Sequence, residues 1–244
     1  MWRGGGGALR AGLGGLVDLL FPRLCPVCRN APLAESQPFC PGCTERIEPL
    51  PPGRCSRCAL PFVAVAGSTH LCADCLRHEP PFGRVHAAGL YAGSLKQALQ
   101  LFKYSGAIEL DRTLARLLCA MLPPLSGDEI LLPVPLHPQR LRHRGYNQSL
   151  LLARAMACIL QIPLERTLLE RVVATPSQQG LDARQRMSNL HGAFRCRRRL
   201  QGERMLLVDD VMTTGATLAA CSYALLDAGA GSVDGAVVGR APRH

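Results

Sequence analysis

The sequence predicts an α/β protein with a mainly parallel sheet, preceded by a small cysteine-rich module. Beyond residue 83, short apolar segments alternate with stretches of helical periodicity, which is typical of strand–helix–strand units. Before that point, eight cysteines form four C-x-x-C pairs. The 244 residues are 48% hydrophobic and 19% charged, which provides enough apolar material for a folded core. We expect three regions: a lead-in helix (1–22), the cysteine-rich module (23–80) and the α/β domain (81–244).

The lead-in segment is expected to be an amphipathic helix, because the apolar positions of residues 8–21 recur at roughly helical spacing. Packing onto the rest of the protein is favoured over a membrane-surface role. No apolar run reaches the roughly 20 residues that a membrane span requires. A signal peptide is not indicated, since Asp18 interrupts the run and FPRL follows in place of small residues. We therefore expect a cytoplasmic protein.

The cysteine-rich module is predicted to bind two structural zinc ions. Its four pairs are separated by 11, 11 and 13 residues, and two such pairs complete a tetrahedral shell of thiolates. A disulfide scaffold would need an export signal, and a thioredoxin-type motif would need one pair on a strand–helix unit. The expected ligands are Cys25, Cys28, Cys40, Cys43, Cys55, Cys58, Cys72 and Cys75.

Two pairing schemes are compatible with these cysteines. Sequential pairing gives two tandem ribbons, and alternating pairing gives a cross-brace. The short and nearly equal gaps favour the sequential scheme. The four remaining cysteines have no partner spacing and are predicted to be small core residues: Cys119, Cys158, Cys196 and Cys221.

The charge balance is moderately basic. The formal net charge is +10, from 28 Lys and Arg against 18 Asp and Glu. Two zinc ions held by eight thiolates would lower it to roughly +6. This charge suits phosphate-bearing ligands or nucleic acid and selects neither. Aromatic residues are only 5% of the chain, which disfavours an aromatic platform for stacking single-stranded bases.

The α/β domain begins after the breaker cluster HEPPFG, residues 78–83. Apolar, β-prone segments predict strands at 84–91, 130–134, 168–173, 204–208 and 233–238. Helical periodicity predicts helices at 94–102, 147–161 and 216–228, and a further helix with one face formed by Leu110, Leu114, Leu117, Leu118 and Met121. Since parallel sheets bind ligands beyond the carboxyl ends of their strands, the loops there are the expected site.

The most informative segment is MLLVDDVMTTGAT, residues 205–217. Residues 205–208 predict a buried strand, and Asp209 and Asp210 follow at its carboxyl end. The stretch TTGAT, 213–217, then opens the next helix. Backbone N–H groups at a helix N-terminus bind anions, and glycine lets the backbone approach a phosphate closely.

The two carboxylates and the threonine-rich loop together predict a ribose 5-phosphate site. Carboxylates would repel a phosphate but suit ribose hydroxyls or a metal-bound water, while threonine hydroxyls add donors to the phosphate. A capped strand–helix junction explains one threonine, but it does not explain the acids, the other threonines and the glycine in this order. The segment contains neither a dinucleotide-binding fingerprint nor a P-loop.

MLLVDDVMTTGAT resembles the signature of type I phosphoribosyltransferases, which bind phosphoribosyl pyrophosphate with Mg²⁺. The wider chain resembles the ComF family, which joins N-terminal zinc ribbons to such a domain and is linked to DNA uptake in competent bacteria. The supporting segments are LKQALQLFKYSG (95–106), PVPLHPQRLRHRGYNQSLLLA (133–153) and RVVATPSQQGLDARQRMSNLHGAF (171–194). Tyr146 departs mildly from the family, in which Phe is commoner at this position.

The resemblance implies a role for each matching residue. It places the ribose on Asp209 and Asp210, and the 5-phosphate on Thr213, Thr214, Gly215, Ala216 and Thr217. It places the pyrophosphate above Pro135, Leu136 and His137, with Arg140, Arg142 and Arg144 close by. From the residues alone, three arginines after a strand end suit a phosphate clamp, with a solvated basic stretch as the alternative.

Two further features have two interpretations each. Lys103 is expected to reach the pyrophosphate, or else to be an ordinary surface lysine. The polar stretch 174–190, which includes Gln178 and Arg186, suits a hood over the acceptor or a long loop.

The implied reaction is displacement of pyrophosphate at ribose C1 by a nitrogen acceptor, with Mg²⁺ and phosphoribosyl pyrophosphate bound and two structural Zn²⁺. The residues expected at the reaction are Asp209, Asp210, His137 and Lys103, and no protein nucleophile is required. One rival is a sensor that binds phosphoribosyl pyrophosphate or a nucleotide without turnover. Another is an adaptor that binds single-stranded DNA through the ribbons and through Arg195, Arg197, Arg198 and Arg199. DNA-uptake proteins are the expected partners, and the acceptor, turnover and a homodimer are left open.

Overall fold

The computed structural model describes residues 23–33, 37–62, 70–173 and 192–242. The chain divides into two compact units, Met1–Arg46 and Ile47–His244. The division falls between the two cysteine clusters, so the second cluster belongs to the same unit as the sheet. The predicted lead-in helix lies outside the described residues, and the boundaries expected at 22 and 80 stay predictions. No helix of the described residues is long and apolar enough to span a membrane.

Both cysteine clusters have the same local construction. The first pair of each sits in a turn closed by an antiparallel bridge, Leu24 with Pro32 and Arg54 with Pro61. The second pair spans a one-turn helix, α2 (Pro41–Thr44) or α3 (Ala73–Arg77), which begins directly after a cysteine. Prolines and glycines in these segments, among them Pro26, Pro41, Gly42 and Gly53, favour short turns over long helices.

The larger unit contains a four-stranded parallel sheet, as the sequence predicts. The strand order is β1 (Val85–Leu90), β6 (Ser232–Arg240), β5 (Arg204–Met212) and β2 (Glu129–Pro133). Every neighbouring pair is parallel. The two central strands are the longest and carry the most buried residues, so the carboxyl end of β5 is firmly held.

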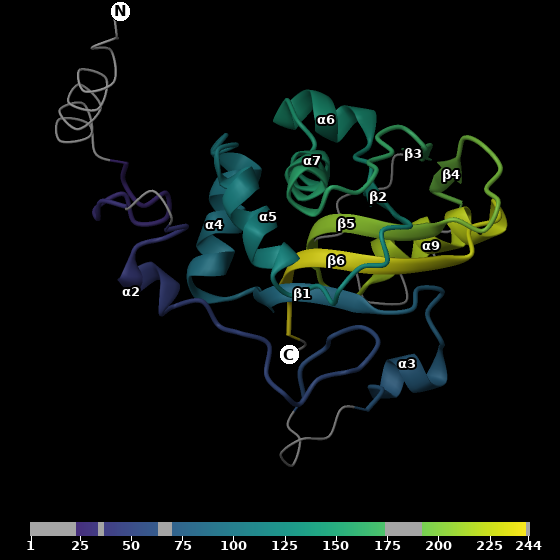
Figure 1. Ribbon diagram of the computed structural model, residues 1–244, viewed down its shortest axis with the longest axis horizontal. Coiled ribbons are helices and arrows are strands. Elements are labelled where there is room, and N and C mark those ends of the chain that lie inside the picture. The colour runs from purple at the N-terminus through teal and green to yellow at the C-terminus, as the bar shows by residue number, and fades with distance from the viewer. Residues whose placement is uncertain (1–22, 34–36, 63–69, 174–191, 243–244) are drawn as a thin grey trace, which may run out of the picture. The chain divides into compact units, whose positions relative to one another are not determined.

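Helices flank this sheet. Helices α4 (Gly93–Tyr104), α5 (Leu110–Cys119) and α7 (Gln148–Leu160) lie together on one side of it (Figure 1). Helix α9 (Ala216–Asp227) packs against β6 and β4. The core that α9 shares with the sheet also includes the four cysteines of the second cluster. Zinc binding by that cluster is therefore part of the packing of the larger unit.

A small antiparallel pair, β3 (Leu169–Arg171) with β4 (Phe194–Cys196), stands apart from the main sheet. The sequence predicts the first of these strands but not the second. The polar stretch between them, including Gln178 and Arg186, lies outside the described residues.

The structure corrects three other expectations. Strand β5 continues to Met212 instead of ending at residue 208, because Asp209, Val211 and Met212 pair with β6. The arginine-rich segment after β2, where no helix is predicted from the sequence, forms helix α6 (Pro138–Arg144). Met121 lies beyond α5 and is exposed, since the helix ends two residues earlier.

The prediction that the four unpaired cysteines are core residues is right only for Cys221, which is fully buried. Cys158 is exposed, and Cys119 and Cys196 are partly exposed. The reason is that all three lie near the end of a helix or strand, where one side of the element faces solvent.

Candidate functional site

The acid pair lies near the carboxyl end of β5 and meets a lysine from α4. The Nζ of Lys103 is 2.9 Å from Oδ1 of Asp210, and the two side chains are only 15% and 11% exposed. Asp210 is buried, whereas Asp209 keeps a partly exposed edge. Lys103 is therefore not a surface lysine; it neutralises a carboxylate at the candidate ribose site.

Asp209 is held by donors from a different element. The hydroxyl of Ser149 and the backbone N–H of Asp210 each donate to its Oδ1 at 2.9 Å. Ser149 lies in the first turn of α7, whose N-cap is Asn147. The Asn147 side chain accepts from the backbone N–H of Ser149 and donates to the carbonyl of Val134. Helix α7, the end of β2 and the acid pair are thus fixed to one another.

Burial and charge shift the pKa values of this group. Desolvation, and then the neighbouring charge of Asp210, raise the pKa of Asp209 to about 7. Desolvation lowers the pKa of Lys103, but the charge and hydrogen bond of Asp210 outweigh it, so that pKa is raised. Lys103 therefore stays protonated at neutral pH, while Asp209 titrates near neutrality in the free protein.

This raised pKa predicts a pH-dependent stability. Because the folded-state pKa of Asp209 lies above its ordinary value of 3.8, the folded state binds more protons than the unfolded state between about pH 4 and 7. The contribution of Asp209 to the free energy of unfolding is therefore fully present below pH 4 and is lost as the pH rises through 7. Relative to Asp209→Asn, the wild type should lose on the order of 1–3 kcal/mol of unfolding free energy between pH 5 and 8.

Urea unfolding of both proteins across that range measures the difference. His86, whose pKa is lowered by burial, contributes with the opposite sign, but it is common to both proteins and cancels. If the difference in unfolding free energy between wild type and Asp209→Asn does not change with pH, the pKa of Asp209 is not raised in the folded protein.

The threonine-rich loop follows the acid pair and leads into α9. Gly215 is the N-cap of α9 and has a φ of 83°, in the left-handed region that favours glycine. A Cβ on this residue would lie 2.5 Å from the terminal methyl of Met212. The hydroxyl of Thr214 accepts from the backbone N–H of Ala216, while Thr213 is exposed. The N-cap residue of the helix is thus the glycine and not one of the threonines.

The residues expected around a pyrophosphate lie between β2 and α7. Pro135, Leu136 and His137 follow β2, and Nδ1 of His137 caps α6 by accepting from the N–H of Gln139 at 3.3 Å. This bond gives the His137 ring a positioning role in the free protein. Of the three arginines, Arg142 is exposed and Arg140 is partly buried. Arg144 lies over the ring of Tyr104 and donates to Gln148, which itself bonds the carbonyl of Lys103.

Three residues near the acid pair are not predicted as site residues from the sequence: Ser149, Asn147 and Arg171. Ser149 and Asn147 lie in the segment YNQS, where an asparagine before a helical stretch is a recognisable capping signal. Arg171 on β3 is buried, and burial followed by the charge of Arg140 lowers its pKa, with Asp209 acting in the opposite direction. No local signal in the sequence distinguishes Arg171 from the many other arginines.

Both cysteine clusters fit zinc. In each, the four sulfur atoms lie within 4.8 Å of one another, and the members are the first with the second pair and the third with the fourth. Tetrahedral Zn–S bonds of about 2.3 Å separate the sulfurs by about 3.8 Å. The Cys28–Cys40 and Cys58–Cys72 sulfur distances are both 3.7 Å. Sequential pairing is confirmed, and four protein ligands at each site make the zinc structural.

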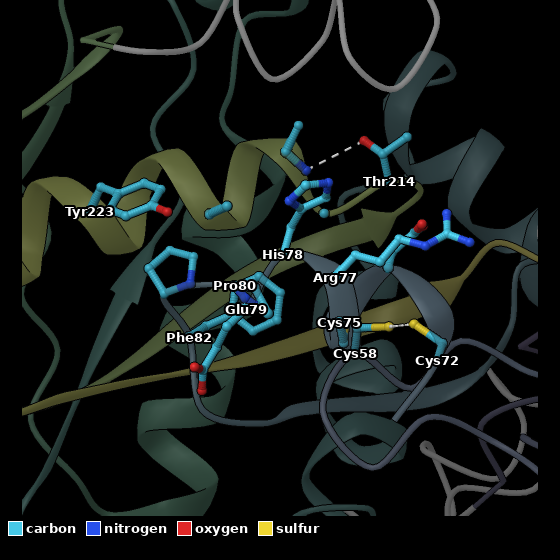
Figure 2. Close-up of a pocket in the computed structure, with 15 residues that line it drawn as sticks. Cys58, Cys72, Cys75, Arg77, His78, Glu79, Pro80, Phe82, Thr214 and Tyr223 are labelled. Carbon is cyan, nitrogen blue, oxygen red and sulfur yellow. Dashed lines mark hydrogen bonds between the residues drawn. The ribbon is translucent and has the colours of Figure 1, made fainter. Parts of the chain in front are cut away.

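A cavity of about 250 Å³ lies between the second cysteine cluster and the threonine-rich loop. Cys58, Cys72 and Cys75 line one part of it, and Thr214 with the start of α9 lines another (Figure 2). The two features are therefore neighbours in space, although more than 130 residues separate them in the sequence.

Comparison with known proteins identifies similar chains. The family model of the double zinc ribbon domain matches residues 16–76. The chain is 34% identical over 203 residues to competence protein F of Haemophilus influenzae, covering 80% of this chain and 86% of that protein. It is 35% identical over 222 residues to the DNA utilization protein YhgH of Escherichia coli K12, covering 88% and 96%. Competence protein ComFC of Bacillus subtilis is 25% identical, covering 81% of each chain.

A solved structure of TT1426 from Thermus thermophilus aligns with 52% of this chain and 72% of that one. Its sequence identity is 19% and its TM-score is 0.33, which is too low to indicate more than a partial likeness.

Proposed function

The chain belongs to the ComF family of competence and DNA utilization proteins, and from this premise we propose that it binds phosphoribosyl pyrophosphate with Mg²⁺ and acts in DNA uptake. The proposed ligand site consists of Asp209, Asp210 and the loop 213–217. The observation that carries the proposal is the acid pair, in which buried Asp210 is neutralised by Lys103, shortly before a glycine-capped helix start.

The chemistry of the site supports this ligand. Carboxylates accept hydrogen bonds from the vicinal hydroxyls of a ribose, and the amides of the loop and of the first turn of α9 suit the 5-phosphate. Lys103 and the arginines of α6 suit the pyrophosphate. Mg²⁺, when bound with the ligand, would offset pyrophosphate charge.

We propose that the reaction is transfer of ribose 5-phosphate to a nitrogen acceptor in the cytoplasm. The bond from C1 to the pyrophosphate oxygen breaks and a C1–N bond forms, while the acceptor loses its proton to solvent or to the departing pyrophosphate. Because the sugar becomes positively charged at the transition state, nearby carboxylates stabilise it. Fixing Asp209 through Ser149 keeps that carboxylate in position without reorganisation.

Calorimetric titration with phosphoribosyl pyrophosphate and Mg²⁺ tests the binding step. We expect wild-type binding that weakens about 100-fold or more in Asp209→Asn/Asp210→Asn, because the amide side chains are poorer acceptors and carry no charge. The matched control is Asp128→Asn, an exposed acid outside the site, which should bind like wild type. Absence of wild-type binding in a protein carrying two zinc ions would reject this function.

A second candidate function is single-stranded DNA binding as a non-catalytic adaptor, with DNA-uptake proteins as partners. Of the arginines first suggested for this role, Arg195 and Arg197 pair with Glu170, and Arg198 pairs with Glu165 and Glu203. Their charge is therefore largely offset. A better candidate is a groove of about 390 Å³ between α5 and α7, lined by Arg112, Arg116 and Arg154. These three are exposed and form no ion pair with the described residues.

Fluorescence anisotropy of a labelled single strand at several salt concentrations tests this surface. Each lost phosphate contact reduces the slope of log K against log salt by about 0.7. Arg112→Gln/Arg116→Gln/Arg154→Gln should therefore reduce the slope by about 2, whereas Arg195→Gln/Arg197→Gln/Arg198→Gln should change it little. Equal slopes for all three proteins would exclude the groove as the DNA site.

A further inference from the structure

The most unusual buried group of the larger unit is Arg240, at the end of the central strand β6. It is fully buried. Among the described residues it forms no ion pair with a carboxylate. A buried guanidinium without a counter-charge is strongly unfavourable, so the charge that balances Arg240 has to be sought among its neighbours.

That neighbour is the second cysteine cluster. Nε of Arg240 donates to the carbonyl of Cys58 at 2.8 Å, and Nη2 lies 3.9 Å from the Cys58 sulfur. Four thiolates around one Zn²⁺ carry a net charge of about −2. The zinc-loaded cluster therefore supplies the negative charge that Arg240 lacks elsewhere.

The third nitrogen of the Arg240 guanidinium, Nη1, contacts the backbone at the start of the threonine-rich loop. This Nη1 donates to the carbonyls of Met212 and Thr213, at 3.1 and 2.6 Å, and to that of Ala241. The first two carbonyls lie at the point where β5 ends and the loop begins. One planar side chain thus joins the second cysteine cluster to the backbone that precedes Gly215.

We propose that Arg240 is a positioning residue that makes the conformation of the 213–217 loop depend on zinc in the second cluster. The inference rests on the proposed function for the loop as the phosphate site. It assigns to the second zinc ion a role beyond folding: the metal fixes the residue that shapes the ligand loop. By reciprocity, ligand in the loop should retain zinc in the second cluster.

The first cluster provides a matched control. Arg46 donates from Nη2 to the Cys43 sulfur at 3.2 Å, so each cluster has one arginine against a thiolate. Arg46, however, is exposed and its second contact is the carbonyl of Gly42, within its own turn. Changing Arg46 should therefore leave the loop unaffected.

The test without ligand is hydrogen exchange of the peptide that covers 211–217. Arg240→Lys keeps the charge beside the cluster but loses the planar set of donors, whereas Arg240→Met loses both. Loop exchange should accelerate at least about 10-fold in both variants. Zinc release to a chelator should accelerate only in Arg240→Met. In both Arg240 variants, hydrogen exchange in β2 should match wild type. In Arg46→Lys, exchange should match wild type throughout the protein. A purely structural arginine would accelerate exchange throughout the larger unit.

The test with ligand uses Cys25→Ser, which removes the first zinc site. Saturating phosphoribosyl pyrophosphate with Mg²⁺ should slow zinc release from the second cluster several-fold, and Arg240→Lys should abolish the slowing. Unchanged loop exchange in Arg240→Lys overturns the inference, whether or not the ligand binds. Faster loop exchange in a wild-type-like fold that binds no ligand supports the coupling and rejects only the proposed function.

Discussion

Replacing Lys103 with methionine is expected to lower the free energy of unfolding by about 3–5 kcal/mol at pH 8, because it leaves a buried carboxylate without its cation. The ion pair with Asp210 is 2.9 Å long and both side chains are at most 15% exposed. Asp209 would then lie beside Asp210 without the lysine that offsets the charge of the two acids. The charge of Lys103 lowers the pKa of Asp209, so its removal should raise that pKa further, and part of the loss should disappear near pH 5.

A double-mutant cycle separates the pair from the lysine itself. Asp210→Asn removes the charge that needs a partner, so Lys103→Met/Asp210→Asn should be more stable than Lys103→Met alone. The chain contains one other lysine, Lys96, which is exposed on the same helix α4. Lys96→Met should change stability by less than about 0.5 kcal/mol. Equal losses for the two lysine variants, measured by urea unfolding, would refute the buried-pair account.

The fold and both zinc clusters could be predicted because their signals are local. Cysteine spacing identifies the ligands, and apolar strands alternating with helices identify a parallel sheet. The length of β5 could not be predicted, because Asp209 and Asp210 look like a loop until β6 pairs alongside them. Long-range pairing keeps polar residues in a strand against their propensity.

Helix α6, unlike the end of β5, has clear local signals in the sequence, but it is not among the predicted helices. Pro138 at the first turn and Gly145 in the left-handed conformation at the end are helix start and stop signals. The three arginines of this segment favour a phosphate clamp or a solvated basic stretch, and neither interpretation predicts a helix. On the helix, Arg140 and Arg144 lie four residues apart and share a face, whereas Arg142 is exposed. Arg144 contacts Tyr104 and Gln148.

The contacts of Lys103 and Arg240 could not be derived from the sequence at all. Lys103 meets an acid more than 100 residues away, and Arg240 meets a cysteine 182 residues away. The Arg240 contact depends on strand order, because β6 lies beside β5 and its last residue reaches the start of the loop. The Lys103 contact depends on the packing of α4 against β1 and β6. The residues that hold the site in place come from distant parts of the chain, and only the fold brings them together. The acid pair and the threonine-rich loop, by contrast, are one continuous segment and can be recognised in the sequence.

Loss of zinc from the second cluster is expected to have the largest effect on the larger unit. Cys55, Cys58, Cys72 and Cys75 are each at most 8% exposed and belong to the same core as Phe82, Val85 and Leu218. Structural zinc sites contribute about 10–16 kcal/mol of binding free energy to folding. Cys55→Ser should therefore bind one zinc per chain and either lose the main calorimetric transition or lower it by more than about 10 °C.

Cys25→Ser is the matched variant, because it removes one ligand from the cluster of the other compact unit. It should also bind one zinc, but its main transition should stay within a few degrees of wild type. Equal effects of the two substitutions would mean that both clusters support the sheet alike. A large effect of Cys55→Ser alone would show that the two ribbons, similar in sequence, have different roles. The second cluster shares its hydrophobic core with the sheet and with the helix that follows the threonine-rich loop.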